Sequence, residues 1–186
     1  MKHITIHIGE MYASREPSVV ETVLGSCVAA CLFDPVNHVG GMNHILLPNR
    51  CKDDPVLARY GEHAMPLLIE RIVRLGGELK HLEAKVFGAA SVLRLDETRL
   101  SVPKANERFI REFLRTHGIP LVAERMGGRH PVKVRLCTST GKALVRALPR
   151  TQLDRVMANE GEHYLAAFLR RWQWFEEGAA LLEEKK

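Results

Sequence analysis

Residues 21–48 read ETVLGSCVAACLFDPVNHVGGMNHILLP, and the rest of the chain is organised around them. Two mostly apolar runs, Val28–Phe33 and Val39–Leu47, flank the turn-forming sequence DPVNH of residues 34–38. Asp-Pro followed by Asn is typical of a turn, and short runs rich in Val, Ile and Leu are consistent with buried strands. This stretch therefore predicts an antiparallel hairpin.

A cysteine and a histidine lie toward the open end of this hairpin. If the turn is centred between Pro35 and Val36, Cys27 is roughly opposite His44, at a cross-strand distance of about 5 Å. A thiol and an imidazole that close form the minimal pair of nucleophile and base. The residue types alone leave a second interpretation open, in which Cys27 is a small buried hydrophobic residue and His44 a core histidine of a strand.

The residues before Cys27 favour the catalytic interpretation. Gly25 permits a tight bend that brings the thiol to a strand end, and backbone N–H groups near Ser26 can converge there to stabilise an oxyanion. Thr22 lies just upstream, where its hydroxyl can orient the imidazole as the third member of a triad. We therefore take Cys27, His44 and Thr22 as candidate catalytic residues, and Gly25 and Ser26 as candidate substrate-binding residues.

Two segments of this stretch, LGSCVAACLFDP and GGMNHILLP, resemble the CheD family, the chemoreceptor glutamine deamidases of bacterial chemotaxis. The resemblance covers roughly residues 1–148, and its later motifs follow in the same order and at similar spacing as in the family. Its later parts are KVFGAA (Lys85–Ala90), Asn106 at the start of a helix, GGRHPVKV and the Thr140-Gly141 turn. One difference concerns the threonine, which lies six residues before the cysteine in family members with TLGLGSC but five before it here, at Thr22.

The resemblance implies a sandwich of sheets and helices with the Cys–His pair at one edge. It also implies an enzyme that converts chemoreceptor glutamines to glutamate through a thioester on Cys27, with His44 as acid and base. Its partners would be chemoreceptor cytoplasmic domains and a CheC-type phosphatase bound at the active face. Some family members hydrolyse receptor glutamyl esters, and the sequence does not decide between amide and ester.

The composition of the 186 residues is ordinary for a globular protein, with 46% hydrophobic and 26% charged residues and a formal net charge of +5. No apolar run approaches the ~20 residues of a membrane span, and Met1–Ile4 does not begin a signal peptide, so we expect a cytoplasmic protein without membrane insertion. A predicted strand places Arg129, Lys133 and Arg135 together. This cationic segment has no interleaved aromatic residues, so we expect no nucleic-acid binding.

The four cysteines, Cys27, Cys31, Cys51 and Cys137, form no disulfide framework and have no second close Cys or His pair that would complete a zinc site. There is also no Gly-rich phosphate loop, so we expect neither a metal nor a cofactor. A thiol redox sensor, with Cys31 resolving Cys27, remains an alternative. It requires a helix after Cys27, because a strand separates the two thiols by more than ~12 Å.

Periodicity predicts strands over residues 4–8, 18–24, 82–87, 119–124, 132–136 and 142–148, besides the two of the hairpin. It predicts helices over residues 60–75, with Pro66 inside, and 104–117. Residues 9–17, 48–55 and 91–103 are expected to form loops. We therefore expect a mixed α/β fold of largely antiparallel sheet layers with helices.

The chain divides into a single domain over residues 1–150 and a helical C-terminal extension over residues 151–186. The extension has an apolar stripe, and it either docks on the domain or binds a partner. A different class of function also stays open, a non-catalytic adaptor that binds a CheC-type phosphatase or a receptor. The intact pair of Cys27 and His44 argues against the adaptor, which would need neither residue.

Overall fold

The computed structural model describes residues 1–49, 55–91 and 102–149, together with residues 158 and 162. The strands are β1 (Lys2–Thr5), β2 (Met11–Ser14), β3 (Ser18–Leu24), β4 (Val28–Asp34), β5 (Val39–Asn43), β6 (Glu83–Gly88), β7 (Leu121–Met126), β8 (Val132–Cys137) and β9 (Ala143–Ala147). The helices are α1 (Gly61–Arg74) and α2 (Val102–Thr116), with short 3-10 helices at η1 (Leu57–Arg59) and η2 (Leu79–His81).

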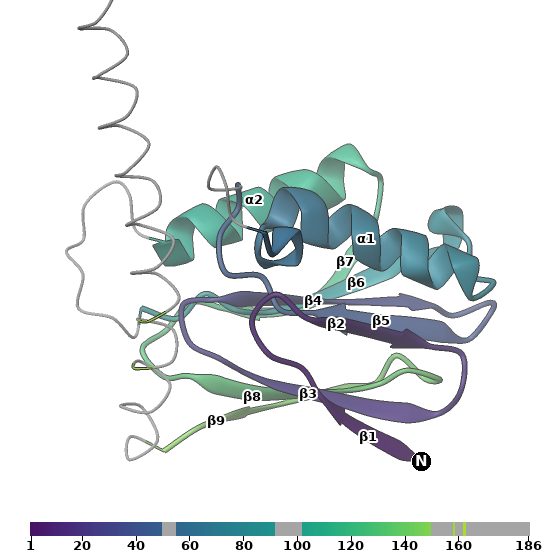
Figure 1. The fold of residues 1–186 in the computed structure, drawn as a ribbon, viewed down its shortest axis with the longest axis horizontal. Coiled ribbons are helices and arrows are strands. Elements are labelled where there is room, and N and C mark those ends of the chain that lie inside the picture. The colour runs from purple at the N-terminus through teal and green to yellow at the C-terminus, as the bar shows by residue number, and fades with distance from the viewer. Residues whose placement is uncertain (50–54, 92–101, 150–157, 159–161, 163–186) are drawn as a thin grey trace, which may run out of the picture.

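These elements form three layers (Figure 1). The middle layer is a five-stranded sheet in the order β2-β5-β4-β6-β7, and α1 and α2 cover one of its faces. A four-stranded sheet in the order β1-β3-β8-β9 lies against the other face. Only β1 with β3 and β6 with β7 pair in parallel among the described strands. The mixed, largely antiparallel α/β sandwich expected from the sequence is confirmed.

The middle sheet is buried on both faces, because side chains along a strand alternate between two apolar cores. Along β4, Val28 and Leu32 belong to the core that contains helical residues such as Leu68. Ala29 and Cys31 belong to the second core, which fills the space between the two sheets. This double burial explains why the predicted hairpin strands read as continuous apolar runs.

Most elements predicted from periodicity are present. β3 has the predicted bounds, and β4, β6, β7, β8 and β9 agree within about two residues at each end. The predicted helices correspond to α1 and α2, and α1 begins at Gly61 and continues through Pro66. The helix therefore begins well before the proline, whose missing N–H lies within the second turn.

Three predictions about strands are wrong. The second strand of the hairpin was expected over Val39–Leu47, but β5 ends at Asn43, beyond which Ile45 forms an isolated bridge with Val28. Residues 9–17 were expected to be irregular, but they contain β2, which pairs with β5 at the edge of the middle sheet. The strand expected over residues 4–8 ends at Thr5, although Ile6 and Ile8 are buried as their alternation suggests. Alternating apolar residues thus predicted burial correctly here, whereas strand pairing depends on a partner distant in sequence.

Some predictions fall on residues that the structure does not describe. These are most of the loops over residues 48–55 and 91–103 and, apart from residues 158 and 162, the helical extension over residues 151–186. The boundary between domain and extension at residue 150 therefore stays a prediction.

The hairpin of β4 and β5 has a different register from the predicted one. Cys31 pairs with Met42, and the turn is centred one residue further along, between Val36 and Asn37. The Asp34 side chain sets this turn, since its Oδ1 accepts hydrogen bonds from the backbone N–H groups of Val36 and Asn37, both at 2.9 Å. This shift of the turn moves the partner of every strand residue by two positions.

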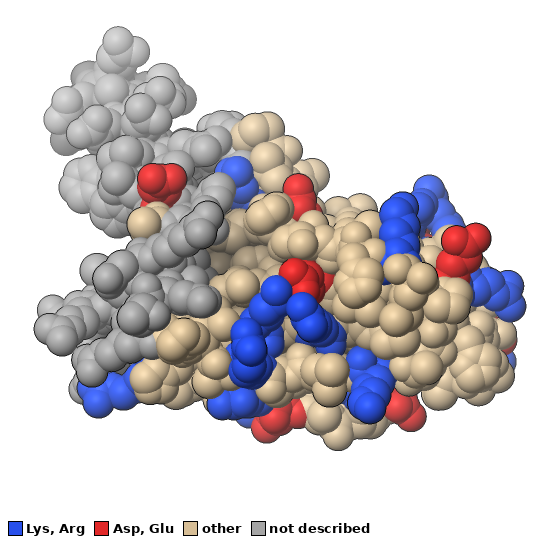
Figure 2. Space-filling view, turned by 90° about the horizontal axis from the view of Figure 1, so that it is seen from below, with Lys and Arg blue, Asp and Glu red and all other residues tan. Residues whose placement is uncertain are grey.

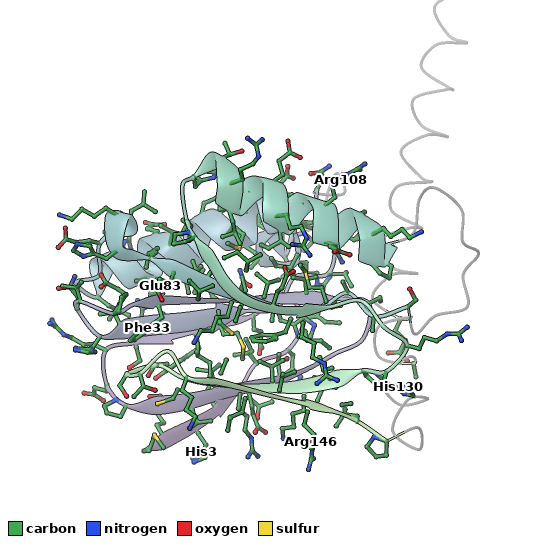
Figure 3. The ribbon with its side chains drawn as sticks, turned by 180° about the vertical axis from the view of Figure 1, so that it is seen from behind. His3, Phe33, Glu83, Arg108, His130 and Arg146 are labelled. Carbon is green, nitrogen blue, oxygen red and sulfur yellow. The ribbon has the colours of Figure 1, made fainter. Side chains whose placement is uncertain are left out.

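The outer face of the four-stranded sheet carries a cluster of charges, which Figure 2 shows as blue and red side chains on the underside of the molecule. Glu21 accepts hydrogen bonds from Lys133 Nζ at 2.8 Å and Arg135 Nε at 2.9 Å, and the bond from Lys133 is the main reason that the pKa of Glu21 is lowered. In Figure 3, His3 and Arg146 point away from the same sheet. Two of the expected cationic residues are therefore paired with an acidic one.

Candidate active site between the two sheets

The predicted catalytic residues lie where the chain passes from one sheet to the other. Residues 25–27 form a bend between β3 of the four-stranded sheet and β4 of the middle sheet. Cys27 directly precedes β4 and is fully buried in the core between the sheets. Thr22 lies on β3 and His44 directly follows β5, so the candidate residues come from both sheets.

Thr22 and His44 are linked by a hydrogen bond across the two sheets. Thr22 Oγ1 lies 2.9 Å from His44 Nδ1 and 2.8 Å from the backbone oxygen of Ile6. A hydroxyl has one hydrogen and a carbonyl oxygen only accepts, so Thr22 donates to Ile6 and accepts from His44 Nδ1–H. A neutral His44 in this tautomer has its lone pair on Nε2, which is therefore the basic nitrogen.

The side chain of His44 points into the core between the sheets. Its backbone N–H donates to Glu10 O at 3.0 Å, while the next residue, Ile45, exchanges two hydrogen bonds with Val28 at 2.8 and 3.0 Å. These bonds keep the backbone extended at His44 and Ile45, after β5 has ended. Successive side chains therefore still alternate between the two faces of the sheet. Ile45 belongs to the helix-side core, which leaves His44 on the face that also holds Cys27.

Cys27 and His44 are diagonal neighbours in the hairpin. The bridge between Val28 and Ile45 sets Cys27 opposite Leu46, and His44 is two residues before Leu46 on the same face. Diagonal neighbours of an antiparallel pair are about 7–8 Å apart between Cα atoms, and the side chains approach more closely. The prediction that Cys27 is roughly opposite His44 is wrong by two residues in register. Because this shift is even, both side chains still lie on the same face.

The bend that carries Cys27 is held by the end of β6. The backbone N–H of Ala90 donates to Gly25 O at 2.8 Å, and that of Ala89 donates to Cys27 O at 2.7 Å. Ser26, between these two positions, is 1% exposed. The structure thus places the predicted substrate-binding residues Gly25 and Ser26 in the bend beside Cys27.

Small residues at the end of β6 allow this close approach. Gly88 has φ +112°, and a Cβ atom there would overlap the carbonyl oxygen of Cys27. The next residue, Ala89, has φ +53°, an uncommon conformation for a residue with a side chain. Backbone in sparsely populated conformations is characteristic of functional sites, where the surrounding contacts maintain it.

Asn106 on α2 is a site residue whose contacts the sequence did not predict. Its Nδ2 donates to Ser26 O at 3.2 Å and to Leu46 O at 3.0 Å, and the side chain is 1% exposed. The sequence nevertheless contains a pattern that could have identified Asn106. Asn106 precedes Ile110 and Leu114 at intervals of four residues, so the asparagine occupies the buried stripe of an amphipathic helix, where a polar residue is unusual.

A small cavity of about 110 Å³ adjoins the pair of Thr22 and His44. Its remaining lining comes from residues 5–8 and from the neighbouring strands, including Glu21 and Lys133. Cys27 does not line it. A polar cavity of this size has room for water. His44 therefore contacts the core that holds Cys27 and also a space suited to water.

The other two described cysteines, Cys31 and Cys137, have pKa values shifted in opposite directions. Burial raises the pKa of Cys31 to about 12, whereas the hydrogen bond with Ser139 is the main cause of a lowered pKa at the half-buried Cys137. Residues 28–34 form a strand, so Cys27 and Cys31 are about 13 Å apart along it, which argues against the redox-sensor alternative. Within the described ranges, no three His, Cys, Asp or Glu residues are grouped as metal ligands.

The fold and this site define a mixed α/β sandwich with a Thr–His pair beside a buried cysteine between its sheets. The family model described as CheD chemotactic sensory transduction matches residues 46–147. The chain is also 44% identical over 155 residues to proteins of Burkholderia mallei and Burkholderia pseudomallei, a match that covers 81% of this chain and 65% of each relative. It is 45% identical over 143 residues to a protein of Ralstonia nicotianae, which covers 75% of this chain and 61% of that relative.

This chain belongs to the CheD family. The three relatives are each named a probable chemoreceptor glutamine deamidase CheD. The matches span a little less than two thirds of the length of these relatives. Among the residues that the structure describes, no helix is long and apolar enough to cross a membrane.

Proposed function

We propose that this protein is a glutamine deamidase that converts glutamine side chains of chemoreceptors to glutamate. The observation that supports the proposal is the hydrogen bond of Thr22 with His44, because it leaves Nε2 as the basic nitrogen of a histidine on the same face of the hairpin as Cys27. Membership of the CheD family and the names of the relatives support the same reaction and the same substrate class. The substrate would be the cytoplasmic part of a receptor, so the reaction takes place in the cytoplasm.

The reaction begins with transfer of the Cys27 thiol proton to His44 Nε2. The thiolate attacks the carboxamide carbon, and backbone N–H groups of the Ser26–Cys27 bend stabilise the oxyanion. When the tetrahedral intermediate collapses, the protonated Nε2 gives its proton to the amide nitrogen, and ammonia leaves. This step leaves a thioester between Cys27 and the receptor side chain.

Hydrolysis of the thioester completes the cycle. His44 Nε2 removes a proton from water, the resulting hydroxide attacks the thioester carbon, and the Cys27 sulfur leaves and regains its proton from His44. The cavity beside Thr22 and His44 is a source of that water. The receptor then carries a carboxylate in place of a neutral amide. This added negative charge is a local electrostatic change that can bias a signalling equilibrium.

Thr22 acts through His44 in this mechanism. Its hydroxyl accepts the Nδ1–H hydrogen bond, so Nδ1 keeps its proton throughout the cycle and Nε2 is the nitrogen that takes up and gives back protons. The buried Cys27 becomes accessible to a receptor glutamine only when the residues that cover it move apart. A CheC-type phosphatase bound at the face where these residues move apart would regulate access to Cys27. Binding of such a partner is part of the proposal.

The test is incubation of the full chain with the cytoplasmic fragment of a cognate chemoreceptor, followed by intact-mass measurement of the receptor. We expect the small mass increase that accompanies replacement of NH2 by OH at specific glutamines, with equimolar release of ammonia. Cys27→Ala and His44→Ala should both abolish it. Cys137→Ala serves as the matched control, because it removes a described cysteine outside the site and should leave the reaction intact.

A different result would overturn the proposal. If the wild-type chain binds the receptor fragment but produces neither the mass increase nor ammonia, the deamidase function is wrong, and a non-catalytic adaptor that uses the same face explains the binding. If methyl esters of receptor glutamates are hydrolysed while glutamines stay unchanged, the Cys–His chemistry stands but the substrate group is an ester.

A further inference from the structure

The side chain of Asn106 connects two segments that carry the proposed catalytic residues. Its Nδ2 donates one hydrogen to Ser26 O, beside Cys27, and the other to Leu46 O, two residues after His44. Both acceptors are carbonyl oxygens, so only the NH2 end of the amide can make the pair of bonds, which fixes the orientation of the side chain.

Asn106 acts where direct pairing of the two strands ends. Val28 and Ile45 form the last backbone bridge of the hairpin on this side. At the next position, the N–H of Leu46 donates to Arg59 O at 2.8 Å, away from the Cys27 segment, while the Leu46 carbonyl accepts from Asn106. The Asn106 amide thus takes the place of a ladder hydrogen bond between the bend and the histidine segment.

The same amide fixes the peptide plane between Ser26 and Cys27. A trans peptide is planar, so its C=O and the following N–H point in opposite directions. Because Asn106 holds Ser26 O, the N–H of Cys27 points to the other side, and Ala89 and Ala90 fix the adjacent carbonyls in the same way. The direction of a proposed oxyanion donor therefore depends on an α2 side chain.

The two ends of the Asn106 amide differ in their hydrogen bonds. Its Oδ1 is buried and has no hydrogen-bond partner among the described residues. A buried acceptor without a partner is costly, and the two hydrogen bonds that the NH2 group gives to Ser26 O and Leu46 O offset that cost. Among the described residues, Asn106 therefore connects the two segments through its NH2 group.

We propose that Asn106 is a positioning residue, which sets the separation of Cys27 from His44 and the direction of the Cys27 N–H. This inference rests on the proposed deamidase function for its catalytic consequence, while the positioning itself has a readout that needs no receptor. Cys27 is buried, so iodoacetamide reaches it through local opening of the fold, and rapid reaction near neutral pH then requires His44 to be close enough to stabilise the thiolate.

The experiment compares Asn106→Asp with Asn43→Asp in the full chain. Asn43 is also 1% exposed, but its amide contacts Ala30 N at 3.0 Å and Ala64 O at 3.3 Å on the helix side of the sheet. Both changes replace a buried amide with a carboxyl group, and the folded fraction of each variant corrects for the difference in structural penalty between the two sites. Circular dichroism and thermal unfolding give the folded fraction of each variant.

For Asn106→Asp we expect slower alkylation of Cys27 at neutral pH and a pH profile displaced toward higher pH, both followed by peptide mass mapping. We also expect kcat for deamidation to fall about tenfold to a hundredfold, with KM unchanged within about twofold. Misplaced catalytic groups slow the chemical step more than they weaken substrate binding. Asn43→Asp should match the wild type in both measurements once corrected for its folded fraction. If Asn106→Asp does not fold, Asn106→Ser replaces it with the same expectations.

The outcomes separate this inference from the proposed function. If the wild type does not deamidate the receptor, the proposed function fails, and the alkylation profile still decides the role of Asn106. If the Asn106 variants retain the wild-type alkylation profile, or if Asn43→Asp changes it equally, Asn106 does not position the pair and the inference is overturned.

Discussion

The hydroxyl of Thr22 has one hydrogen and two hydrogen-bond partners, Ile6 O and His44 Nδ1. Only one assignment of donor and acceptor satisfies both bonds. Ile6 O takes the hydrogen, so His44 Nδ1 must donate. A side chain from the opposite sheet thereby selects the tautomer of the histidine. The threonine lies five residues before Cys27, and at this spacing it is on the inner face of β3.

Thr22→Val removes this hydroxyl and keeps the shape of the side chain. We expect kcat for receptor deamidation to fall about tenfold or more, because the imidazole loses the contact that sets its tautomer. Thr22→Ser retains the hydroxyl and should keep most of the activity. Nitrogen NMR of His44 should show the Nδ1–H tautomer in the wild type and in Thr22→Ser only. Equal activities of the two variants would show that the hydroxyl does not orient the histidine.

Thiol reactivity gives a second prediction for individual residues. Native protein treated with iodoacetamide near neutral pH should be modified first at Cys137, which is partly exposed and has a lowered pKa. Cys27 and Cys31 are both buried, so each reacts only through local opening of the fold. Cys27 should follow Cys137 because His44 stabilises its thiolate, whereas Cys31 should remain unmodified because burial raises its pKa to about 12. Peptide mapping over time measures the order, with urea-unfolded protein as the control in which all sites react. Modification of Cys31 as fast as Cys27 would contradict the proposed activation by His44.

At the scale of elements, the β4–β5 hairpin depends on its turn as much as on its strands. The Asp34 carboxylate accepts hydrogen bonds within the turn and also from the backbone N–H of Glu78 at 2.8 Å. It therefore ties the hairpin to the chain that follows α1. Cys27 and His44 lie at the opposite end, so the register set by Asp34 determines their relative positions.

This turn should make stability dependent on pH. Burial of Asp34 opposes its ionisation, but hydrogen bonds from Asn37, Glu78 and Val36 outweigh burial and lower its pKa from 3.8 to about 2. The folded state thus binds this proton less readily than the unfolded chain. The stabilisation is present above the unfolded pKa and is lost as the pH falls through about 2. At about 1.4 kcal/mol for each pKa unit, about 2 kcal/mol of unfolding free energy is involved.

Urea unfolding of the wild type and of Asp34→Asn between neutral and acidic pH tests this expectation. The variant should be less stable than the wild type above about pH 4, and the difference should shrink as the pH falls toward 2. Parallel curves at all pH values would mean that Asp34 is not the titrating group.

At the scale of the molecule, the two cores have different roles. The core under the helices stabilises the middle sheet, whereas the core between the sheets also surrounds Thr22, Cys27 and His44. Val134 on β8 pairs with Thr22, and Val86 on β6 belongs to the helix-side core. Both valines are fully buried.

Val134→Ala and Val86→Ala therefore form a matched pair. Each should lower the free energy of unfolding by about 1–3 kcal/mol through lost packing, measured by denaturant titration. Only Val134→Ala should also lower kcat, because it loosens the strand that supports Thr22. Equal activities of the two folded variants would show that the catalytic arrangement is insensitive to the core between the sheets.

The sequence by itself determined most of the strands, both α-helices and the residues that are candidates for the site. Apolar periodicity identified β3, β4, α1 and α2, because burial of one or two faces leaves a repeat among near neighbours. The cysteine, the histidine and the threonine were recognisable from their residue types and from the resemblance to the CheD family.

Only the tertiary structure decided how these residues meet. The register of the hairpin depends on the side-chain bonds of Asp34, and β2 forms because β5 offers an edge. The tautomer of His44 depends on the carbonyl of Ile6, and the position of Cys27 on Asn106, which is 80 residues from Ser26 in the chain. Such contacts join residues far apart in sequence, so no local pattern records them, and they exist only once both sheets and α2 have packed together.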